Sequence, residues 1–370
     1  MRIAIVHDWL TGMRGGEKVL LELVRMFPSA DVYTLLWSPG SVAREIEARV
    51  KGVSFLQRLP HAAQAYRYYL PLFPAAVRSL DLRAYDLILT SSHAVAKGAA
   101  VPPKAVHICY MHTPMRYVWD TGADYFRFGA GRWWKRSALS MVAPYLRRFD
   151  RRTSQRVDFF LANSENVRNR IRRIYKSDAR VIPPPVDTDF FTPAESGPGG
   201  DYYLVVSPLE PYKRIDLAIE AFSGGRRRLL VAGSGTLDHE LRRRARAPVE
   251  FLGHVPDGEL RELYRHCRAL IFPGLEDFGI VPVEAQACGR PVVCFGEGGA
   301  RETVVDGQTG VHFRSQTRRD LLDAVEALES KPWDSALIRR HSLHFSRRRF
   351  RERMEAFWHS ELPASYDFAA

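Results

Sequence analysis

The segment IFPGLEDFGIVPVEAQACGRPVV, residues 271–293, carries the pattern that decides the fold. Its first residues continue an apolar run that is typical of a buried strand, and Gly279 stands where a helix is expected to begin. Pro282 fits this interpretation, because proline is tolerated in the first turn of a helix and not in its interior. The segment therefore predicts a strand, a glycine-containing loop and a helix, which is the repeating unit of an open α/β sheet.

The start of this predicted helix is a candidate anion site. Its backbone N–H groups would be free and aimed at a ligand such as a phosphate; they belong to Phe278, Gly279, Ile280 and Val281. Glu276 would lie beside whatever the phosphate carries, and Glu284, one turn inside the helix, would accept hydrogen bonds from a pair of hydroxyls. Two glutamates at this spacing also arise by chance, so a solvated pair of carboxylates near a helix start is an equally good interpretation.

The same alternation of strand and helix extends through most of the chain. The N-terminal RIAIV is typical of a buried strand that ends at HDWLTGMRGGEK, where Gly15 and Gly16 precede an apolar-periodic helix. Further strand-like runs are separated by stretches long enough for a helix; they are 32–36, 85–90, 104–110, 157–162, 180–183, 202–207, 227–233, 249–253, 268–274 and 291–296. This pattern predicts parallel strands joined by crossover helices.

A proline-rich segment, residues 182–201, interrupts the periodicity and is the best linker candidate. The sequence therefore predicts two Rossmann-like α/β domains, residues 1–185 and 186–344. The chain then continues into an arginine-rich helix, residues 345–362, with one apolar stripe and one basic face. Two open sheets joined by a linker are expected to face a central cleft at the carboxyl ends of their strands, where such sheets bind ligands.

Charge is the unusual feature of the composition. The 370 residues contain 54 Lys and Arg against 42 Asp and Glu, and this net charge of +12 favours anionic partners such as nucleic acid, nucleotide substrates or acidic membranes. A nucleic-acid-binding protein stays a remote alternative, because the sequence has no zinc, helix-turn-helix or RNP-type motif. Four cysteines without a recognisable spacing favour a reducing cytoplasm, and MRIAIVHDWL is too polar for a signal-peptide core.

Several segments together resemble the retaining glycosyltransferases of family 4, which have the GT-B fold. Besides residues 271–293 they are HDWLTGMRGGEK (7–18), CYMHTPMRYVWD (109–120), VIPPPVDTDFF (181–191), VVSPLEPYKRIDLAIEAF (205–222), VAGSG (231–235) and FLGHV (251–255). The resemblance covers nearly the whole chain, and it implies that the C-terminal helix crosses back to the first domain. The sequence around His112 and Lys213 most resembles bacterial mannosyltransferase-like members that build surface polysaccharides.

The resemblance also implies site residues. His112, Lys213 and Glu276 become the catalytic centre, where His112 touches the transferred sugar and Lys213 faces a diphosphate that gains negative charge as the glycosidic bond breaks. The implied donor-binding residues are Gly15, Gly16, Ser207, Lys213, Arg214, Gly233, Gly235, His254, Glu276, Phe278, Gly279, Ile280, Val281 and Glu284. Pro208 stands where the family commonly has an arginine, so either Arg214 supplies the missing charge or backbone amides hold the diphosphate.

The glycines have two interpretations. Gly15 and Gly16 would allow the chain to approach a ligand closely, with dihedral angles that other residues avoid. Gly233 and Gly235 would open space for the nucleotide, while a plain strand-to-helix turn is the alternative. For His254 the backbone, more than the side chain, would face the base. For Lys213 and Arg214 the alternative is a surface pair on a helix.

The first domain is expected to select the acceptor. Residues 90–98, TSSHAVAKG, offer Ser92, His93 and Lys97 as hydrogen-bonding groups, with a helix cap as the alternative; the resemblance adds Arg116 and Trp119. Residues 58–80 and 126–156 mix arginines with aromatic side chains, which in the second stretch include Trp133, Trp134 and Tyr145. Such mixtures suit a segment that lies on anionic lipid, and core aromatics with solvated arginines between them are the alternative.

The sequence thus predicts a retaining glycosyltransferase that moves a hexose, with mannose from GDP-mannose as the first candidate, to a hydroxyl of a lipid-linked or oligosaccharide acceptor in glycan biosynthesis. A UDP-sugar donor, or a nucleotide-sugar epimerase or hydrolase of the same fold, is the alternative. The nucleotide sugar is a co-substrate; no cofactor, no essential divalent metal and no nucleic-acid partner are expected. The expected location is the cytoplasm, peripherally on the inner face of the membrane.

Overall fold

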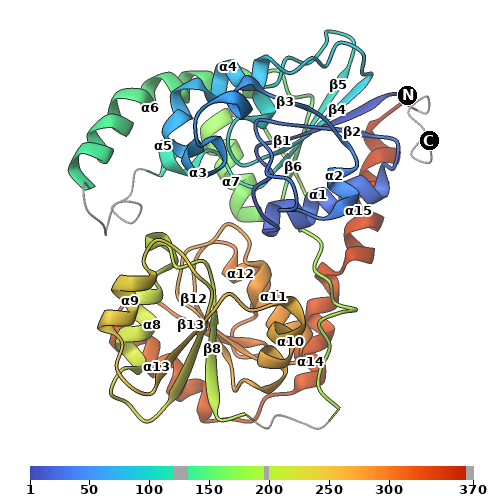
Figure 1. Cartoon of the computed structure of the whole chain (residues 1–370). Helices are drawn as coiled ribbons and strands as arrows, with labels where there is room; N and C mark the ends of the chain where they lie inside the picture. Colours follow the sequence, from blue (N-terminus) through green and yellow to red (C-terminus); the bar gives the residue numbers. More distant parts are fainter. Residues whose placement is uncertain (121–131, 196–199, 364–370) are drawn as a thin grey trace. The chain divides into compact units, whose positions relative to one another are not determined.

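The computed structural model describes residues 1–120, 132–195 and 200–363, with side chains for all of these except residues 67 and 132–138. Contacts within the chain divide it into two units (Figure 1). The first unit comprises residues 1–120, 133–185 and 350–363, and the second comprises residues 186–195 and 200–349. The sequence places these boundaries after residues 185 and 344.

The first unit is built on a seven-stranded parallel sheet with the order β3-β2-β1-β4-β5-β6-β7. Its strands are β1 (Ile3–His7), β2 (Asp31–Thr34), β3 (Val50–Val53), β4 (Leu87–Ser92), β5 (Val106–Met111), β6 (Phe159–Ala162) and β7 (Arg180–Val181). The order reverses beside β1, which has β2 on one side and β4 on the other. This is the order of a Rossmann-type sheet.

Helices cover both faces of this sheet (Figure 1). Successive strand residues point to opposite faces, so Ile3 and Ile5 pack with α1 (Gly15–Met26), while Ala4 and Val6 pack with α4 (Phe73–Arg78) and α6 (Arg132–Ser154). The other helical segments are α2 (Arg44–Glu47), η1 (Phe55–Arg58), α3 (Ala62–Ala65), η2 (Tyr66–Leu72), η3 (Ala96–Gly98), α5 (Arg116–Trp119) and α7 (Glu165–Tyr175).

The C-terminal helix α15 (Arg347–Glu361) packs on the first unit. Its apolar stripe, Phe350, Met354, Phe357 and Trp358, joins the core that contains α1. The indole of Trp358 is 1% exposed, and its ring centroid lies 4.9 Å from that of Phe27. The prediction that this helix crosses back to the first domain is confirmed.

The second unit repeats the plan with a six-stranded parallel sheet, β10-β9-β8-β11-β12-β13, whose order reverses beside β8. The strands are β8 (Tyr202–Val206), β9 (Arg228–Ala232), β10 (Val249–Gly253), β11 (Leu270–Phe272), β12 (Val292–Phe295) and β13 (Gly310–Phe313). The helical segments are η5 (Pro211–Lys213), α8 (Ile215–Phe222), α9 (Asp238–Arg244), α10 (Asp257–His266), α11 (Ile280–Ala287), α12 (Ala300–Thr303), α13 (Arg318–Glu329), α14 (Ser335–Ser342) and η6 (Leu343–Phe345). The prediction of two α/β domains, each with its own parallel sheet, is confirmed.

The sequence did not predict strands β3 and β13. Both lie at a sheet edge, are only four residues long and contain a glycine. All four residues of β3 and the two central residues of β13 are partly or fully exposed, so both strands lack the continuous apolar run that marks the central strands.

The packing of α15 predicts that Trp358→Ala will destabilise the first unit by about 3–5 kcal/mol, because it empties a buried site against Phe27. Hydrogen exchange followed by mass spectrometry should show faster exchange in β1 and β4 and unchanged exchange in β8 and β11. Glu355→Ala, on the exposed face of the same helix, is the control. Equal acceleration in both units would contradict the assignment of α15 to the first.

Candidate active site

Lys213 and Glu276 meet at the carboxyl edge of the second sheet. Lys213 ends η5, which follows β8, and Glu276 lies in the loop that follows β11. Lys213 Nζ donates to Glu276 Oε1, and the two side chains are only 17% and 15% exposed. Because β8 and β11 are neighbours where the strand order reverses, the ion pair stands where open parallel sheets bind ligands.

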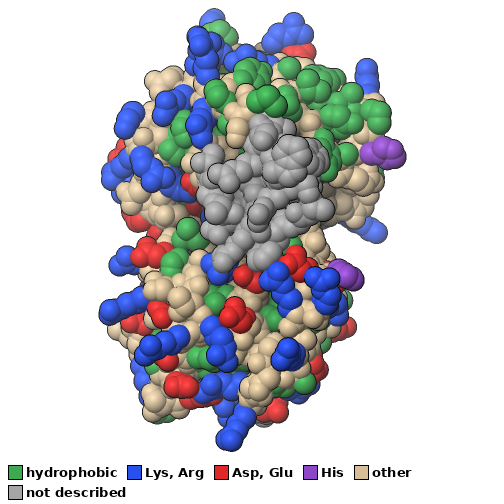
Figure 2. Space-filling model, turned by 90° about the vertical axis from the view of Figure 1, so that its left-hand side faces the viewer, with side chains coloured by type: hydrophobic (Ala, Val, Ile, Leu, Met, Phe, Trp, Pro, Cys, Tyr) green, Lys and Arg blue, Asp and Glu red, His purple; other side chains and the backbone are tan. Residues whose placement is uncertain are grey.

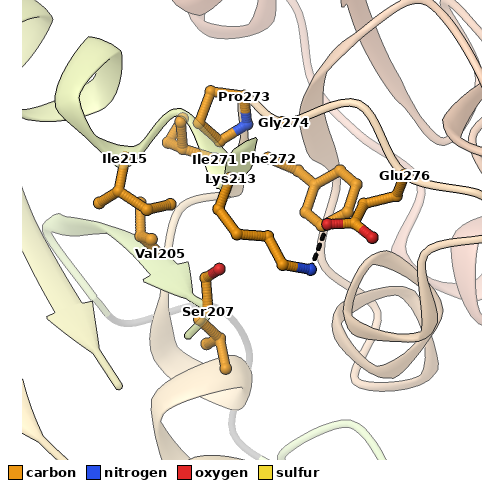
Figure 3. A pocket seen from close by; sticks show the side chains of 10 residues that line it. Val205, Ser207, Lys213, Ile215, Ile271, Phe272, Pro273, Gly274 and Glu276 are labelled. Atoms are coloured by element: carbon orange, nitrogen blue, oxygen red, sulfur yellow. Dashed lines mark hydrogen bonds and ion pairs between the residues drawn. The ribbon is translucent and has the colours of Figure 1, made fainter. Parts of the chain in front are cut away.

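The ion pair lies at one side of a small pocket (Figure 3). The pocket is lined by Val205, Val206, Ser207, Lys213, Ile215, Ile271, Phe272, Pro273, Gly274 and Glu276. Its empty volume of about 200 Å³ includes space that is open to solvent. The pocket is therefore small, with a cation and a carboxylate at its edge.

Gly274 allows the two loops to approach each other. A Cβ atom at this position would lie 2.8 Å from the carbonyl oxygen of Lys213 and 3.0 Å from its Cα. Those atoms are backbone, so the clash could not be relieved by turning a side chain. The position of the Lys213 ammonium thus depends on a glycine in the neighbouring loop.

Gly233 and Gly235 hold a second backbone contact. A Cβ at Gly233, where φ is +133°, would lie 1.9 Å from the carbonyl oxygen of Ser207, and a Cβ at Gly235 would lie 2.6 Å from the backbone of Leu209. The loop after β8 thus fills the space that a side chain at either glycine would need, and the contact of these glycines with a nucleotide stays a prediction. Gly233 N also donates to the carbonyl of Gly253 (2.6 Å), next to the exposed His254.

Helix α11 begins where the sequence predicts it. Gly279 is its N-cap with φ +92°, and Pro282 lies in its first turn. The first N–H groups of a helix have no intrahelical acceptor, and Gly279, Ile280 and Val281 are partly exposed. The side chain of Phe278 instead packs in a small apolar cluster with Val186, Val283 and Phe345, so only its backbone could face a ligand.

Glu284 is more enclosed than the sequence suggests. Glu284 is only 3% exposed, and its Oε2 accepts a hydrogen bond from the Tyr264 hydroxyl (3.1 Å). The alternative of two solvated carboxylates is therefore wrong for this residue. Its predicted contact with ligand hydroxyls stays a prediction.

Arg214 is held by protein groups. Its guanidinium donates to Gln316 Oε1 (2.8 Å) and to Asp216 Oδ1 (3.4 Å), and Gln316 Nε2 donates in turn to the carbonyl of Pro273 (2.8 Å). This chain of contacts braces the loop that carries Glu276. In this structure Arg214 thus acts as a brace, and the alternative that it makes up for the exposed Pro208 by meeting a diphosphate stays a prediction.

In the first unit, imidazoles gather at the corresponding reversal of strand order. His7 ends β1, His112 follows β5, and the Ser91 hydroxyl lies 3.0 Å from His7 Nδ1 and 2.8 Å from His112 Nε2. The ring centroid of His93 is 6.1 Å from that of His112. Burial, with the nearby imidazoles of His93 and His7, holds the pKa of His112 well below its usual value, and burial likewise lowers the pKa of His93. His112 is therefore neutral near pH 7.

The glycine loop of this unit lies against the same histidines. Gly15 and Gly16 form the first turn of α1, and the left-handed φ of this loop belongs to Gly12 (+152°). The expectation of unusual dihedral angles at Gly15 and Gly16 is thus wrong. A Cβ at Gly16 would lie 3.5 Å from His7 Cε1 and 3.7 Å from His112 Nε2, so the helix start does approach His112 closely.

The acceptor-side residues do not all face outward. Lys97 is 1% exposed; its Nζ pairs with the Asp150 carboxylate and donates to Thr153 Oγ1 (3.2 Å), and Ser92 is fully buried. The prediction that Ser92 and Lys97 offer groups to an acceptor is therefore wrong, because burial and pairing occupy both. The His93 side chain is 25% exposed, so its hydrogen bond to an acceptor stays a prediction.

The two further acceptor-side residues lie in α5. Arg116 Nε is 3.7 Å from Asp120 Oδ2, and Trp119 Nε1 donates to Asp150 Oδ2 (2.6 Å). Trp119 therefore belongs to the network around Lys97, while its ring is partly exposed. Contact of Arg116 or Trp119 with an acceptor stays a prediction.

Four residues of these two sites were not predicted: His7, Glu17, Ser91 and Gly274. Each has a signal in the sequence, since His7, Ser91 and Gly274 stand at or just after the carboxyl ends of strands, and Glu17 directly follows Gly16. Within the described residues, no group of three or more His, Cys, Asp or Glu side chains could hold a metal ion.

Two family descriptions match the sequence. Residues 13–190 match Glycosyltransferase Family 4, and residues 188–345 match Glycosyl transferases group 1. Among curated relatives, a D-inositol 3-phosphate glycosyltransferase of Actinosynnema mirum is 31% identical over 207 residues, 47% of this chain and 50% of the relative. A glycogen synthase of Mycobacterium tuberculosis is 35% identical over 150 residues, 38% of this chain and 36% of the relative. The chain spans about half the length of the curated relatives it matches first.

Solved structures show the fold. HepE from Anabaena in complex with UDP and glucose has a TM-score of 0.72 at 18% identity and covers 97% of this chain and 100% of that chain. The sucrose-phosphate synthase of Thermosynechococcus elongatus has a TM-score of 0.72 at 17% identity and covers 97% and 98%. At this level of identity the likeness concerns the fold alone, which is GT-B, as the resemblance implied.

The backbone contact at Gly233 predicts that Gly233→Ala will destabilise the second unit by about 2–4 kcal/mol, from the strained φ together with overpacking. Chemical denaturation measures the change. The matched control is Gly258→Ala in α10, where a Cβ would meet open space and alanine should stabilise by roughly 0.5–1 kcal/mol. Equal effects of the two substitutions would contradict the packing role.

Proposed function

The chain carries a Glycosyltransferase Family 4 domain followed by a Glycosyl transferases group 1 domain, and from this premise we propose that it is a retaining glycosyltransferase. It moves a hexose from a nucleoside diphosphate sugar to a hydroxyl of a lipid-linked or oligosaccharide acceptor. The observation that carries the proposal is the Lys213–Glu276 pair, held where strand order reverses and beside the partly exposed start of α11.

The chemistry follows from charge. When the bond between the sugar and the diphosphate breaks, the departing phosphate oxygen gains negative charge, which Lys213 and the α11 amides would stabilise. Glu276 orients the ammonium of Lys213 and would lie beside the sugar. The acceptor hydroxyl forms the new bond on the same face of the sugar, and its proton passes to the departing phosphate oxygen.

No side-chain nucleophile is needed in this scheme, and the contacts of two carboxylates of the first unit, Asp8 and Asp120, agree with that. Asp8 accepts hydrogen bonds from the amides of His93, Ala94, Val95 and Ala96 (2.7–2.9 Å), and Asp120 accepts from Arg170 (2.6 Å). Both carboxylates thus have a structural task. We propose no metal requirement, because Lys213 and the helix amides supply positive charge.

GDP-mannose is the first donor candidate, since the sequence around His112 and Lys213 resembles that of mannosyltransferase-like members. UDP-glucose is the second candidate, because solved structures of the same fold hold UDP, glucose or UDP-glucose. The side chain of His254 is exposed, and neither base is selected by it alone.

The surface of the first unit favours a membrane-bound acceptor. Exposed apolar side chains lie on η2 and α6: Tyr68, Leu72, Met141 and Tyr145 are 67%, 42%, 77% and 51% exposed. Figure 2 shows hydrophobic side chains beside Lys and Arg on this unit. Tyr66 and Phe73 are buried, so part of the aromatic content is core, and the side chains of Trp133 and Trp134 lie outside the described residues. Every described helix is too short or too polar to cross a bilayer.

Glu276→Gln and Lys213→Met should each lower the transfer rate by about 100-fold to 1,000-fold while the protein stays folded, since each removes a charge that acts on the transition state. The assay follows an acceptor-dependent product from GDP-mannose and UDP-glucose, with NMR of the anomeric proton and with EDTA present. Glu259→Gln, exposed on α10, is the control. Sugar release without an acceptor-dependent product would indicate a hydrolase instead, and wild-type rates in either variant would refute the site.

The exposed face of α6 predicts co-sedimentation with anionic vesicles that is lost in high salt. Met141→Glu with Tyr145→Glu, one turn apart on the helix, should weaken this binding about 10-fold or more, since it places two charges at the lipid surface. Leu252 is an exposed apolar residue of the second unit, and Leu252→Glu should leave the binding to anionic vesicles unchanged. Equal binding to neutral vesicles would contradict the proposal.

A further inference from the structure

The Ser91 hydroxyl links two imidazoles in the first unit. Ser91 Oγ lies 2.8 Å from His112 Nε2 and 3.0 Å from His7 Nδ1. His7 and Ser91 are register partners in neighbouring strands, and Ser91 is fully buried. The Ser91–His7 hydrogen bond is therefore set by the sheet itself and is buried, while the Ser91–His112 bond, to the residue after β5, is partly buried.

The hydroxyl restricts where the protons can be. Ser91 has one proton and two lone pairs, so it can donate to only one of the imidazoles. Within the described residues the two imidazoles are the partners of this hydroxyl, so its proton goes to one of them and it accepts from the other. With neutral histidines, either Ser91 donates to His7 and His112 donates from Nε2, or His7 donates to Ser91 and His112 accepts at Nε2. The choice depends on which group faces Nε2 of His7.

Glu17 faces that nitrogen. Its Oε1 is 3.8 Å from His7 Nε2, and within the described residues no group forms a hydrogen bond to this buried nitrogen. Burial raises the pKa of Glu17, but the His7 imidazole that faces the carboxylate lowers it, and the net shift is downward. The carboxylate is therefore ionised, and it attracts an N–H at His7 Nε2 and repels a bare lone pair. Ser91 must then donate to His7 Nδ1.

We infer that Glu17, acting through His7 and Ser91, fixes His112 in the neutral tautomer that carries its proton on Nε2 and leaves Nδ1 as a hydrogen-bond acceptor. Within the described residues Nδ1 of His112 has no hydrogen-bond partner, while Asn163 Nδ2 donates to the His112 carbonyl (2.9 Å) and holds its backbone. Gly16, at the start of α1, covers the two rings.

This assignment has a consequence for substrates, which rests on the proposed function. An imidazole with a bare Nδ1 accepts from a sugar hydroxyl, so a deoxy sugar that lacks this hydroxyl would leave the acceptor unpaired and bind worse in the transition state. Glu17, His7 and Ser91 are thus positioning residues that make His112 selective for a hydroxyl donor.

The test is 15N NMR of the full chain labelled at histidine, recorded at pH 8, where an ordinary imidazole is neutral. His112→Gln identifies the His112 signals among the 12 histidines by difference. The expected spectrum shows a protonated Nε2 and a bare Nδ1 for His112. A protonated Nδ1 in the unmodified protein would overturn the inference, whatever the activity.

Variants test the chain of contacts. Glu17→Gln can keep the oxygen that accepts from the Arg14 amide (3.0 Å) only by turning its NH2 group toward His7, and Ser91→Ala removes the link. Glu17→Gln should therefore shift His112 toward the tautomer protonated on Nδ1, and Ser91→Ala should give a mixture of tautomers. Glu22→Gln is the matched control, because Glu22 is a carboxylate of the same helix that is 1% exposed but pairs with Arg25 and Arg351. Unchanged His112 signals in both test variants would also overturn the inference.

Activity separates this inference from the proposed function. In Glu17→Gln, kcat should fall about 10-fold, the loss of roughly one hydrogen bond, with nucleoside diphosphate affinity unchanged, because the proposed diphosphate contacts belong to the second unit. If the predicted tautomer is observed and no donor supports transfer, the proposed function fails and the tautomer assignment stands.

Discussion

The contact of Gly274 with the backbone of Lys213 is the interaction on which the proposed chemistry depends. Strands β8 and β11 are neighbours, but their loops lead to opposite sides of the sheet, so nothing in the strands themselves brings the loops together. A glycine lets the two backbones touch, and the touching backbones place the Lys213 ammonium against Glu276. Gly233 and Gly235 fix the other flank, the loop that begins at Ser207. The ion pair is thus held by backbone geometry, which two long side chains alone could not supply.

The first unit uses the same reversal of strand order for a different purpose. Where the second unit has a charged pair, the first has a group of imidazoles. Burial lowers the pKa of His112, and we infer that Ser91 and Glu17 orient its proton. One unit is suited to an anion and the other to hydroxyl groups.

Periodicity and turn chemistry predict most of the fold, because buried parallel strands and glycine at a helix start leave strong local signals. Edge strands β3 and β13 leave weak ones. The error at Lys97 has another cause: a sequence shows that this residue is a cation but not which partner it meets. Lys97 pairs with Asp150, and both residues are buried. Likewise, the sequence does not show that Gly233 contacts the backbone of Ser207.

The most direct measurement compares how strongly the protein binds nucleoside diphosphates and monophosphates by calorimetry, with GDP against GMP and UDP against UMP. If Lys213 faces the terminal phosphate, the unmodified protein prefers the diphosphate of one base by about 10-fold or more, and Lys213→Met binds the two forms with similar affinity. A preference for the diphosphate that survives in Lys213→Met would contradict the placement of the donor phosphate at this residue.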